Sequence, residues 1–198
     1  MITLKHVSKK FKESVIFEDI NYVFDQGKIY CIQGRNGSGK TVLLKMIAGL
    51  LEPDEGSILF DRDVYKGAII ETPVFWPHMS GIETLRYLAG IRGVVDDATI
   101  TLYLEKTGLY EARNKRVGKY SLGMKQRLAI AQALMENPDV ILLDEPSNSL
   151  DDEGVEILRS LLIEEKDKGK TILIATHNTE DMEGITDIYL KVEKRKLL

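Results

Sequence analysis

Short apolar runs alternate along the chain with longer segments in which apolar residues recur every three or four positions. Gly, Asp or Asn bound the short runs, as is typical of buried strands, and the longer segments have the spacing of one helix face. This alternation indicates an α/β fold with a mostly parallel sheet. We expect one domain over residues 1–198, which is long enough to bury a substantial hydrophobic core.

The same pattern predicts the individual elements. Strands are expected at residues 2–7, 20–24, 28–33, 57–60, 68–70, 140–143, 171–175 and 188–192, and helices at 41–51, 121–135 and 151–166. We assign the first two strands to a small antiparallel β layer. Between residues 82 and 109 the apolar residues keep helical spacing and no strand is evident. We therefore interpret residues 72–137, approximately, as a helical lobe inserted into the α/β core.

Charge and composition exclude some classes of protein. The chain carries 27 basic and 31 acidic residues, a formal net charge of −4, which argues against a dedicated nucleic-acid binder. Its one cysteine, Cys31, lies in an apolar run, so we expect a packing role and a reducing compartment. No segment approaches the roughly 18 apolar residues of a membrane span, and no signal peptide is evident. Any membrane role would then come through a partner.

A glycine-rich segment stands between an apolar run and a helical pattern. It reads Gly34-Arg35-Asn36-Gly37-Ser38-Gly39-Lys40-Thr41. Its glycines let backbone N–H groups turn toward phosphate oxygens, and the start of the following helix adds a positive field. Lys40 is expected to reach the β- and γ-phosphates, and Thr41 to offer its hydroxyl to Mg²⁺. The segment predicts a P-loop nucleoside triphosphatase core in which residues 34–41 bind ATP.

Two carboxylates and a histidine follow later apolar runs. Asp144 and Glu145 come directly after residues 140–143, and ligands of open α/β sheets bind at such carboxyl ends of strands. We expect Asp144 to hold Mg²⁺ through water and Glu145 to polarise the attacking water. A lone histidine is usually an ordinary residue, but His177 follows its own core strand. That place favours a catalytic role in which it faces the γ-phosphate and aligns Glu145 and water.

A serine and a glycine open the last helix of the predicted lobe. A serine hydroxyl, a glycine N–H and a helix N-terminus together form an anion site. With the segments above, the chain resembles the ATP-binding cassette (ABC) ATPases over nearly its whole length. Ser121 and Gly123 match the family signature, Leu-Ser-Gly-Gly-Gln, whereas Tyr120, Leu122 and Met124 depart from it. The resemblance implies that Ser121 and Gly123 of one subunit close on the γ-phosphate bound by the other, in a head-to-tail dimer.

The resemblance also assigns roles to other positions. Phe11 falls where an aromatic residue stacks on adenine, although a core residue of an edge strand is the alternative. Residues 149–151 match a loop that crosses the dimer interface, and Asp151 also suits a helix N-cap. Glu71 stands where the family places a glutamine that touches Mg²⁺ and relays the nucleotide state to the membrane partner. We expect Glu71 to contact the metal as well.

Residues 71–79 and 120–127 are similar to those of bacterial exporters of bacitracin-like antibiotics and lantibiotics. Phe75, Trp76 and Met79 form an apolar cluster suited to a coupling helix of a membrane subunit; packing within the lobe is the alternative. The resemblance implies an ATP-hydrolysing transporter subunit that uses ATP and Mg²⁺. Its partners would be a second ABC ATPase, with a homodimer favoured, and a transmembrane permease. The expected location is cytoplasmic, on the inner face of the membrane.

Two other functions fit the sequence less well. The alternative is a soluble ABC ATPase of translation, DNA repair or cluster assembly. The interval between Lys40 and Ser121 is too short for the long coiled coil of repair members, and the chain holds one cassette where translation members usually hold two. A nucleotide-gated scaffold without catalysis is disfavoured, because Lys40, Asp144, Glu145 and His177 are all present.

Overall fold

The computed structural model describes residues 1–198. The strands are β1 (Ile2–Phe11), β2 (Ser14–Phe24), β3 (Ile29–Gln33), β4 (Glu55–Phe60), β5 (Lys66–Ile69), β6 (Val140–Asp144), β7 (Thr171–Thr176), β8 (Ile188–Glu193) and β9 (Lys196–Leu197). The helices are α1 (Lys40–Ala48), α2 (Gly81–Arg92), α3 (Asp97–Lys106), α4 (Leu122–Leu134) and α5 (Asp152–Asp167), with short 3₁₀ turns at Val117–Lys119 and Glu180–Met182.

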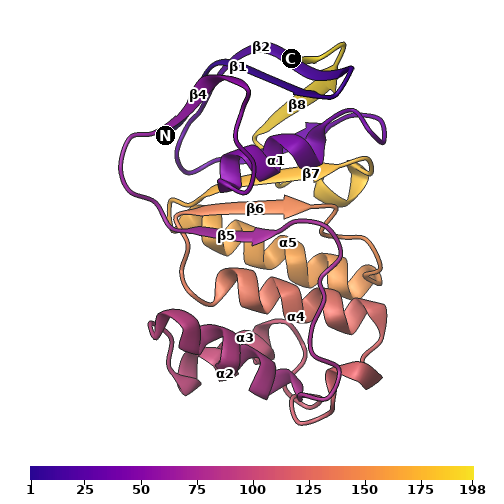
Figure 1. Cartoon of the computed structure of the whole chain (residues 1–198). Coiled ribbons are helices and arrows are strands. Elements are labelled where there is room, and N and C mark those ends of the chain that lie inside the picture. The colour runs from indigo at the N-terminus through magenta and orange to yellow at the C-terminus, as the bar shows by residue number, and fades with distance from the viewer.

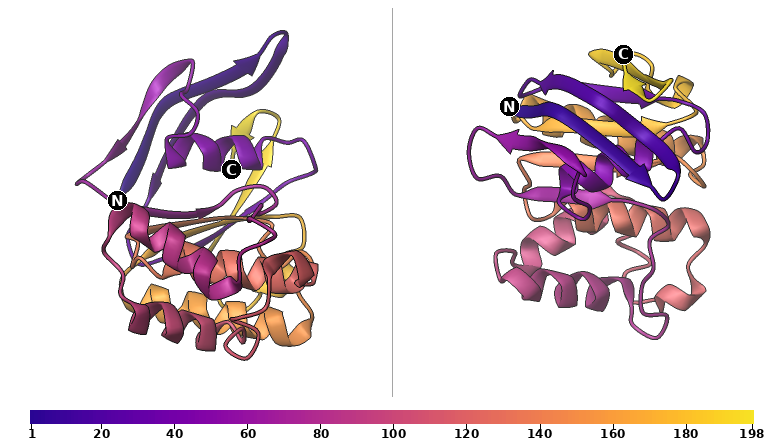
Figure 2. Two further views of the ribbon diagram at one scale, coloured as in Figure 1. Left: turned by 60° about the horizontal axis from the view of Figure 1, so that its bottom comes forward. Right: turned by 45° about the horizontal axis from the view of Figure 1, so that its top comes forward.

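Two sheets make up the fold (Figure 1). Six strands form one sheet in the order β5-β6-β7-β3-β8-β9, in which only β9 runs antiparallel to its neighbour. The other sheet has the order β2-β1-β4 and is antiparallel. Helix α1 lies between the two sheets, and α4 and α5 cover the opposite face of the larger one (Figures 1 and 2). The predicted α/β fold with a small antiparallel layer is confirmed.

The central strands are buried on both faces, which explains their continuous apolar sequences. In β3, Ile29 and Cys31 belong to the core shared with α4 and α5, whereas Tyr30 and Ile32 belong to the core shared with α1 and the antiparallel sheet. Successive side chains of a strand point to opposite faces, so one short run supplies both cores. Cys31 is fully buried, and burial raises the pKa of its thiol to about 11, in keeping with a packing role.

The segment between β5 and β6 is helical. It holds α2, α3, one 3₁₀ turn and α4, and its only β pairing is a single bridge between Ser80 and Arg116. Ser80 begins α2 with a capping box, in which Glu83 donates its N–H to the serine hydroxyl and accepts the Ser80 N–H. Because α4 packs against β5 as well as α2 and α3, the division into a core and a separate lobe stays a prediction.

The observed boundaries differ from the expected ones in the antiparallel layer and at α1. Strands β1 and β2 are much longer than predicted, because bulges near His6 and Asp19 interrupt the alternation of apolar and polar residues without ending the pairing. Both residues adopt a left-handed backbone, with φ near 52° and 50°. Helix α1 ends at Ala48 rather than at residue 51, because Gly49 adopts φ 82° and caps it. The short strand β9 was not predicted.

Candidate active site

The glycine-rich loop joins the end of β3 to the start of α1. Gly39 has φ 110°, and a Cβ at this position would lie 2.7 Å from Ile16 Cγ2, so only glycine fits. The side chain of Lys40 is buried, and its Nζ donates to the Gly34 carbonyl oxygen at 2.8 Å. The Ser38 hydroxyl is buried without a protein partner. An inward-facing ammonium group and an unpaired hydroxyl suit the binding of phosphate oxygens.

Thr41 and Asp144 come together across the loop. The Thr41 hydroxyl donates to Asp144 Oδ2 at 2.6 Å, and burial followed by the nearby Glu145 charge raises the pKa of Asp144, which the Thr41 hydrogen bond partly offsets. No group of three or more His, Cys, Asp or Glu side chains could hold a metal by itself. The hydroxyl and carboxylate oxygens are donors that suit Mg²⁺, which usually takes its other ligands from water and phosphates.

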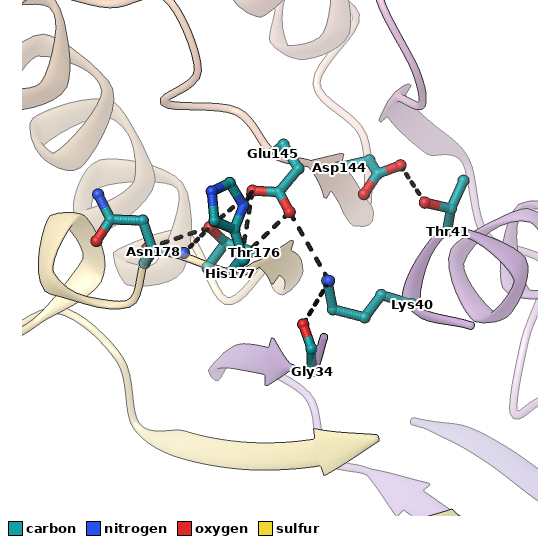
Figure 3. A network of polar contacts seen from close by, with 8 residues as sticks. All are labelled: Gly34, Lys40, Thr41, Asp144, Glu145, Thr176, His177 and Asn178. Atoms are coloured by element: carbon teal, nitrogen blue, oxygen red, sulfur yellow. Dashed lines mark hydrogen bonds and ion pairs between the residues drawn. The ribbon is translucent and has the colours of Figure 1, made fainter. Parts of the chain in front are cut away.

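Glu145 is the centre of a polar network at the carboxyl ends of β6 and β7 (Figure 3). His177 Nδ1 lies 2.9 Å from Glu145 Oε2, and the His177 backbone N–H donates to Oε1 at 3.1 Å. Lys40 Nζ lies 3.8 Å from Oε1. Glu145 itself adopts φ 49°, a left-handed backbone that non-glycine residues rarely hold without a functional constraint. Figure 3 shows the side chains of His177 and Lys40 beside the carboxylate of Glu145, so the three predicted catalytic residues lie together.

Sequence reasoning missed Thr176. Its hydroxyl donates to Glu145 Oε2 at 3.0 Å and lies 3.1 Å from the backbone nitrogen of Asn178 (Figure 3). Thr176 therefore ties the glutamate to the turn that carries His177. The only sequence signal for it is a polar residue at the end of an apolar strand, next to a candidate histidine.

One cleft of about 310 Å³ joins most of the predicted ATP-binding residues. Its lining residues are Phe11, Ile16, Asn36, Gly37, Ser38, Gly39, Lys40, Thr41, Val42, Asp144 and Glu145. Phe11 stands at its lip with 45% of its surface exposed, at the end of β1. An exposed aromatic ring beside a phosphate loop is placed to stack on a base.

Ser121 and Gly123 lie outside that cleft. Ser121 is the N-cap of α4, and its hydroxyl accepts the Met124 N–H at 3.2 Å. A Cβ at Gly123 would lie 2.7 Å from the Ser149 carbonyl oxygen, so the helix start and the loop before α5 pack closely. Both residues line a hollow of about 510 Å³ of their own, together with Arg127 and Asp151. Asp151 is indeed an N-cap, of α5, and it also binds Arg127 at 2.6 Å.

Glu71 is placed differently from the expectation. Its side chain is directed to Lys45 of α1, whose Nζ donates to Glu71 Oε1 at 2.5 Å. The Glu71 backbone adopts φ 65°, and Glu71 and Asp144 line one hollow. The expected metal contact of Glu71 therefore stays a prediction, and Lys45 is a partner that the sequence pattern did not indicate.

The predicted apolar cluster is divided. Phe75 packs against the core, as the alternative reading had it, whereas Trp76 is 43% exposed. The Trp76 ring contacts the ring of Tyr87 on α2 edge to face, with centroids 4.8 Å apart. Val74 is 91% exposed and Ile91 72% exposed. Tyr87 is 55% exposed, and we call these four exposed apolar residues, Val74, Trp76, Tyr87 and Ile91, the apolar face.

Known proteins resemble this chain in sequence. The pattern of the ABC transporter family matches residues 17–148. An uncharacterized ABC transporter ATP-binding protein of Bacillus subtilis (strain 168), YybJ, is 39% identical over 100% of this chain and 94% of its own length. The bacitracin transport ATP-binding protein BcrA of Enterococcus faecalis is 38% identical over 95% of this chain and 65% of its own.

A lantibiotic relative and a solved structure extend the likeness. The lantibiotic transport ATP-binding protein SrtF of Streptococcus pyogenes is 33% identical over 100% of this chain and 89% of its own. The dimeric structure of MJ0796, a bacterial ABC transporter cassette, superimposes with a TM-score of 0.88 at 25% identity, covering 100% of this chain and 96% of that one.

A phosphate loop, a carboxylate pair after β6 and a histidine after β7 on this sheet define a nucleoside triphosphatase site, and the chain belongs to the ABC transporter family. It is an ATP-binding subunit of a transporter and hydrolyses ATP, the general activity of these cassettes. The soluble alternative is not favoured, because the relatives named by function are transport proteins. None of the helices combines the length and the apolar character that a bilayer crossing requires.

Proposed function

We propose that two copies of this chain bind ATP and Mg²⁺ head to tail and drive export through a separate permease. The proposal rests on one observation, which is that the residues predicted to contact the phosphates lie on two separate surfaces of the chain. Lys40 and Thr41 line one cleft, whereas Ser121 and Gly123 line another. An inverted second copy would bring its anion site at Ser121 over the phosphates held by Lys40. The dimeric structure of the MJ0796 cassette supports the association of two copies.

In the closed dimer, catalysis would consist of positioning and electrostatics. Lys40 and the loop N–H groups would hold the β- and γ-phosphates, and Phe11 would stack on adenine. Glu145, held by His177 and Thr176, would orient the attacking water and accept its proton. Thr41 and Asp144 would hold Mg²⁺, which neutralises charge on the phosphates when it is bound.

The partner in the membrane would dock on the apolar face. Exposed apolar surface that is not needed for the core marks interaction sites, and aromatic residues are frequent at their centres. Val74 of this face follows Glu71 by three residues, and Glu71 lines one hollow with Asp144 and Glu145. A permease seated on Trp76 would therefore sense the nucleotide site through a short stretch of chain. This placement would bring the subunit to the inner face of the membrane.

The relatives suggest the cargo. Proteins with the names of bacitracin and lantibiotic transport ATP-binding proteins match nearly the whole chain. We propose that the cargo is a peptide antibiotic of one of these classes, and that the transporter exports it. Cells that express the chain with its permease should then tolerate more bacitracin or more lantibiotic than cells that carry Glu145→Gln. If the two kinds of cell tolerated bacitracin equally and also tolerated the lantibiotic equally, this cargo would be ruled out.

Membrane docking has its own test. Trp76→Ala should reduce co-purification with the permease by about tenfold, as expected for an aromatic residue at the centre of an interface, while ATP binding by the isolated chain stays unchanged. Leu50→Ala, an exposed apolar residue after α1, is the matched control and should co-purify normally. A Trp76→Ala chain that still co-purifies fully would move the docking site away from the apolar face.

A further inference from the structure

The ion pair of Lys45 and Glu71 lies one helical turn from the proposed cation position. Lys45 follows Thr41 by four residues on α1, so both side chains lie on one face of that helix. Thr41 bonds Asp144 and Lys45 bonds Glu71, at 2.6 and 2.5 Å. Two neighbouring contacts therefore join α1 to the carboxyl ends of β6 and β5. The Lys45 side chain is 33% exposed and the Glu71 side chain 65%.

Three carboxylates crowd this part of the site. Glu71, Asp144 and Glu145 line one hollow of about 270 Å³, in which no basic side chain takes part. Lys40 faces Glu145 at its edge, and the pKa of Asp144 is already raised by burial and by the Glu145 charge. If Glu71 were unpaired, its carboxylate would repel the carboxylates of Asp144 and Glu145 and the phosphates of a nucleotide. Lys45 is the cation that contacts Glu71.

We propose that Lys45 is a positioning residue that neutralises Glu71 and holds its carboxylate away from the cation position beside Thr41 and Asp144. The paired Glu71 then presents little net charge to the nucleotide, as a neutral side chain would. Glu71 has a left-handed backbone and begins the segment that leads to Val74 and Trp76 of the apolar face. This inference rests on the nucleotide site proposed above.

The proposal predicts how the pair changes nucleotide binding. Without Lys45, the free Glu71 carboxylate repels ATP that carries no metal and attracts a divalent cation. The affinity for ATP should therefore fall in EDTA and depend more strongly on Mg²⁺. The measured quantity is the ratio of the dissociation constant in EDTA to that in Mg²⁺, determined with a fluorescent ATP analogue. Because a general loss of fold weakens binding in both conditions, it does not raise this ratio.

The variants are Lys45→Met, Lys45→Arg, Glu71→Gln and the double variant Lys45→Met/Glu71→Gln, each in the full chain. We expect the ratio to rise about threefold or more in Lys45→Met, the size of a partly exposed charge effect, and to stay near wild type in Lys45→Arg. The double variant should return to the wild-type ratio. Lys28→Met breaks a pair with Asp25 at the opposite end of β3 and is the matched control, with no change expected.

Two results would overturn the proposal. One is a wild-type ratio in Lys45→Met, and the other is a raised ratio that Glu71→Gln does not reverse. Failure of the nucleotide site itself has a different result: the wild-type chain would not bind the analogue, or Lys40→Ala would bind it equally well. ATP-analogue binding by the wild-type chain and by Lys40→Ala should therefore be measured first. These measurements distinguish failure of the nucleotide site from failure of the role proposed for Lys45.

Discussion

The two halves of the proposed ATP site differ in how far one chain completes them. The phosphate-loop half consists of Lys40, Thr41, Asp144, Glu145 and His177. These residues contact one another or nearby backbone, and all but His177 line one cleft. In the signature half, Ser121 uses its hydroxyl to cap α4 and faces a separate hollow. The phosphate-loop half has its polar groups in contact with one another, and the signature half is the proposed anion site for a nucleotide held by a second copy.

Because of this difference, we expect ATP binding and ATP hydrolysis to depend on different parts of the chain. A single chain has the groups to bind ATP and to orient a water, but the second set of anion contacts would come only with a second copy. Electrostatic stabilisation depends on donors aimed at the charge that develops in the transition state. Variants in the first half should therefore impair both ATP binding and hydrolysis, and variants in the second half should impair hydrolysis more than binding.

Lys40→Ala should have the largest effect. The buried ammonium group is the point charge of the phosphate-loop half, so its loss should reduce hydrolysis by about a hundredfold or more and weaken ATP binding. Steady-state phosphate release and equilibrium binding measure the two effects. Lys66→Ala, a lysine over the Phe60 ring outside the cleft, is the control. A Lys40→Ala chain with more than about a tenth of wild-type turnover would contradict the role assigned to Lys40.

His177→Ala should follow. The imidazole holds Glu145 Oε2 at 2.9 Å, so its loss should lower kcat by about a hundredfold and leave the KM for ATP nearly unchanged. The exposed His78 lies outside the cleft, and His78→Ala should hydrolyse ATP at the wild-type rate. A normal kcat with a raised KM in His177→Ala would make the residue a binding group rather than a group that positions Glu145.

Gly39→Ala and Gly123→Ala compare the halves directly. A methyl group at Gly39 meets Ile16 and Phe17 and strains a backbone at φ 110°, so ATP binding should be lost. A methyl group at Gly123 meets the Ser149 carbonyl oxygen in the other half, so the single chain should still bind ATP while hydrolysis falls about tenfold or more. If both variants lost ATP binding to the same degree, the two halves would not be separable.

The smallest expected effect is one on stability, which Asp144→Asn should change in the nucleotide-free chain. Burial raises the pKa of Asp144 above its ordinary 3.8, so the folded state disfavours the ionised form, and its contribution to stability falls as pH rises from the unfolded to the folded pKa. At pH 7 the amide should raise Tm by about 2 °C or more. The gain should disappear as the pH falls toward 4. An equal gain at both values would contradict a titration effect.

Most features that could be predicted depend on residues that are close together in the sequence. The glycine loop, the Asp144–Glu145 pair and the helix start at Ser121 are each defined within a few neighbouring residues, and the structure places each at the predicted end of its strand or helix. The full length of the β1–β2 hairpin could not be predicted from the sequence. The two strands stay paired beyond His6, although the alternation of apolar and polar residues is interrupted there. The period of two is a sign of a strand only where no extra residue shifts it.

The missed residues share one cause, which is dependence on contacts between distant segments. Lys45 looks like an ordinary helical lysine until the turn after β5 brings Glu71 to it. Thr176 gains its role only because β6 and β7 are neighbours. Tyr87 joins the apolar face through contact with Trp76, which no spacing along the chain encodes.

The most direct test of the two-copy site is the mass of Glu145→Gln in solution with saturating ATP and Mg²⁺, measured by light scattering. This variant should bind ATP without consuming it, so the account predicts twice the chain mass of 22.4 kDa with ATP and the single mass without it. Adding Ser121→Glu, which puts a carboxylate against the phosphates, should restore the single mass. A Glu145→Gln chain that binds ATP and keeps the single mass would contradict the two-copy site.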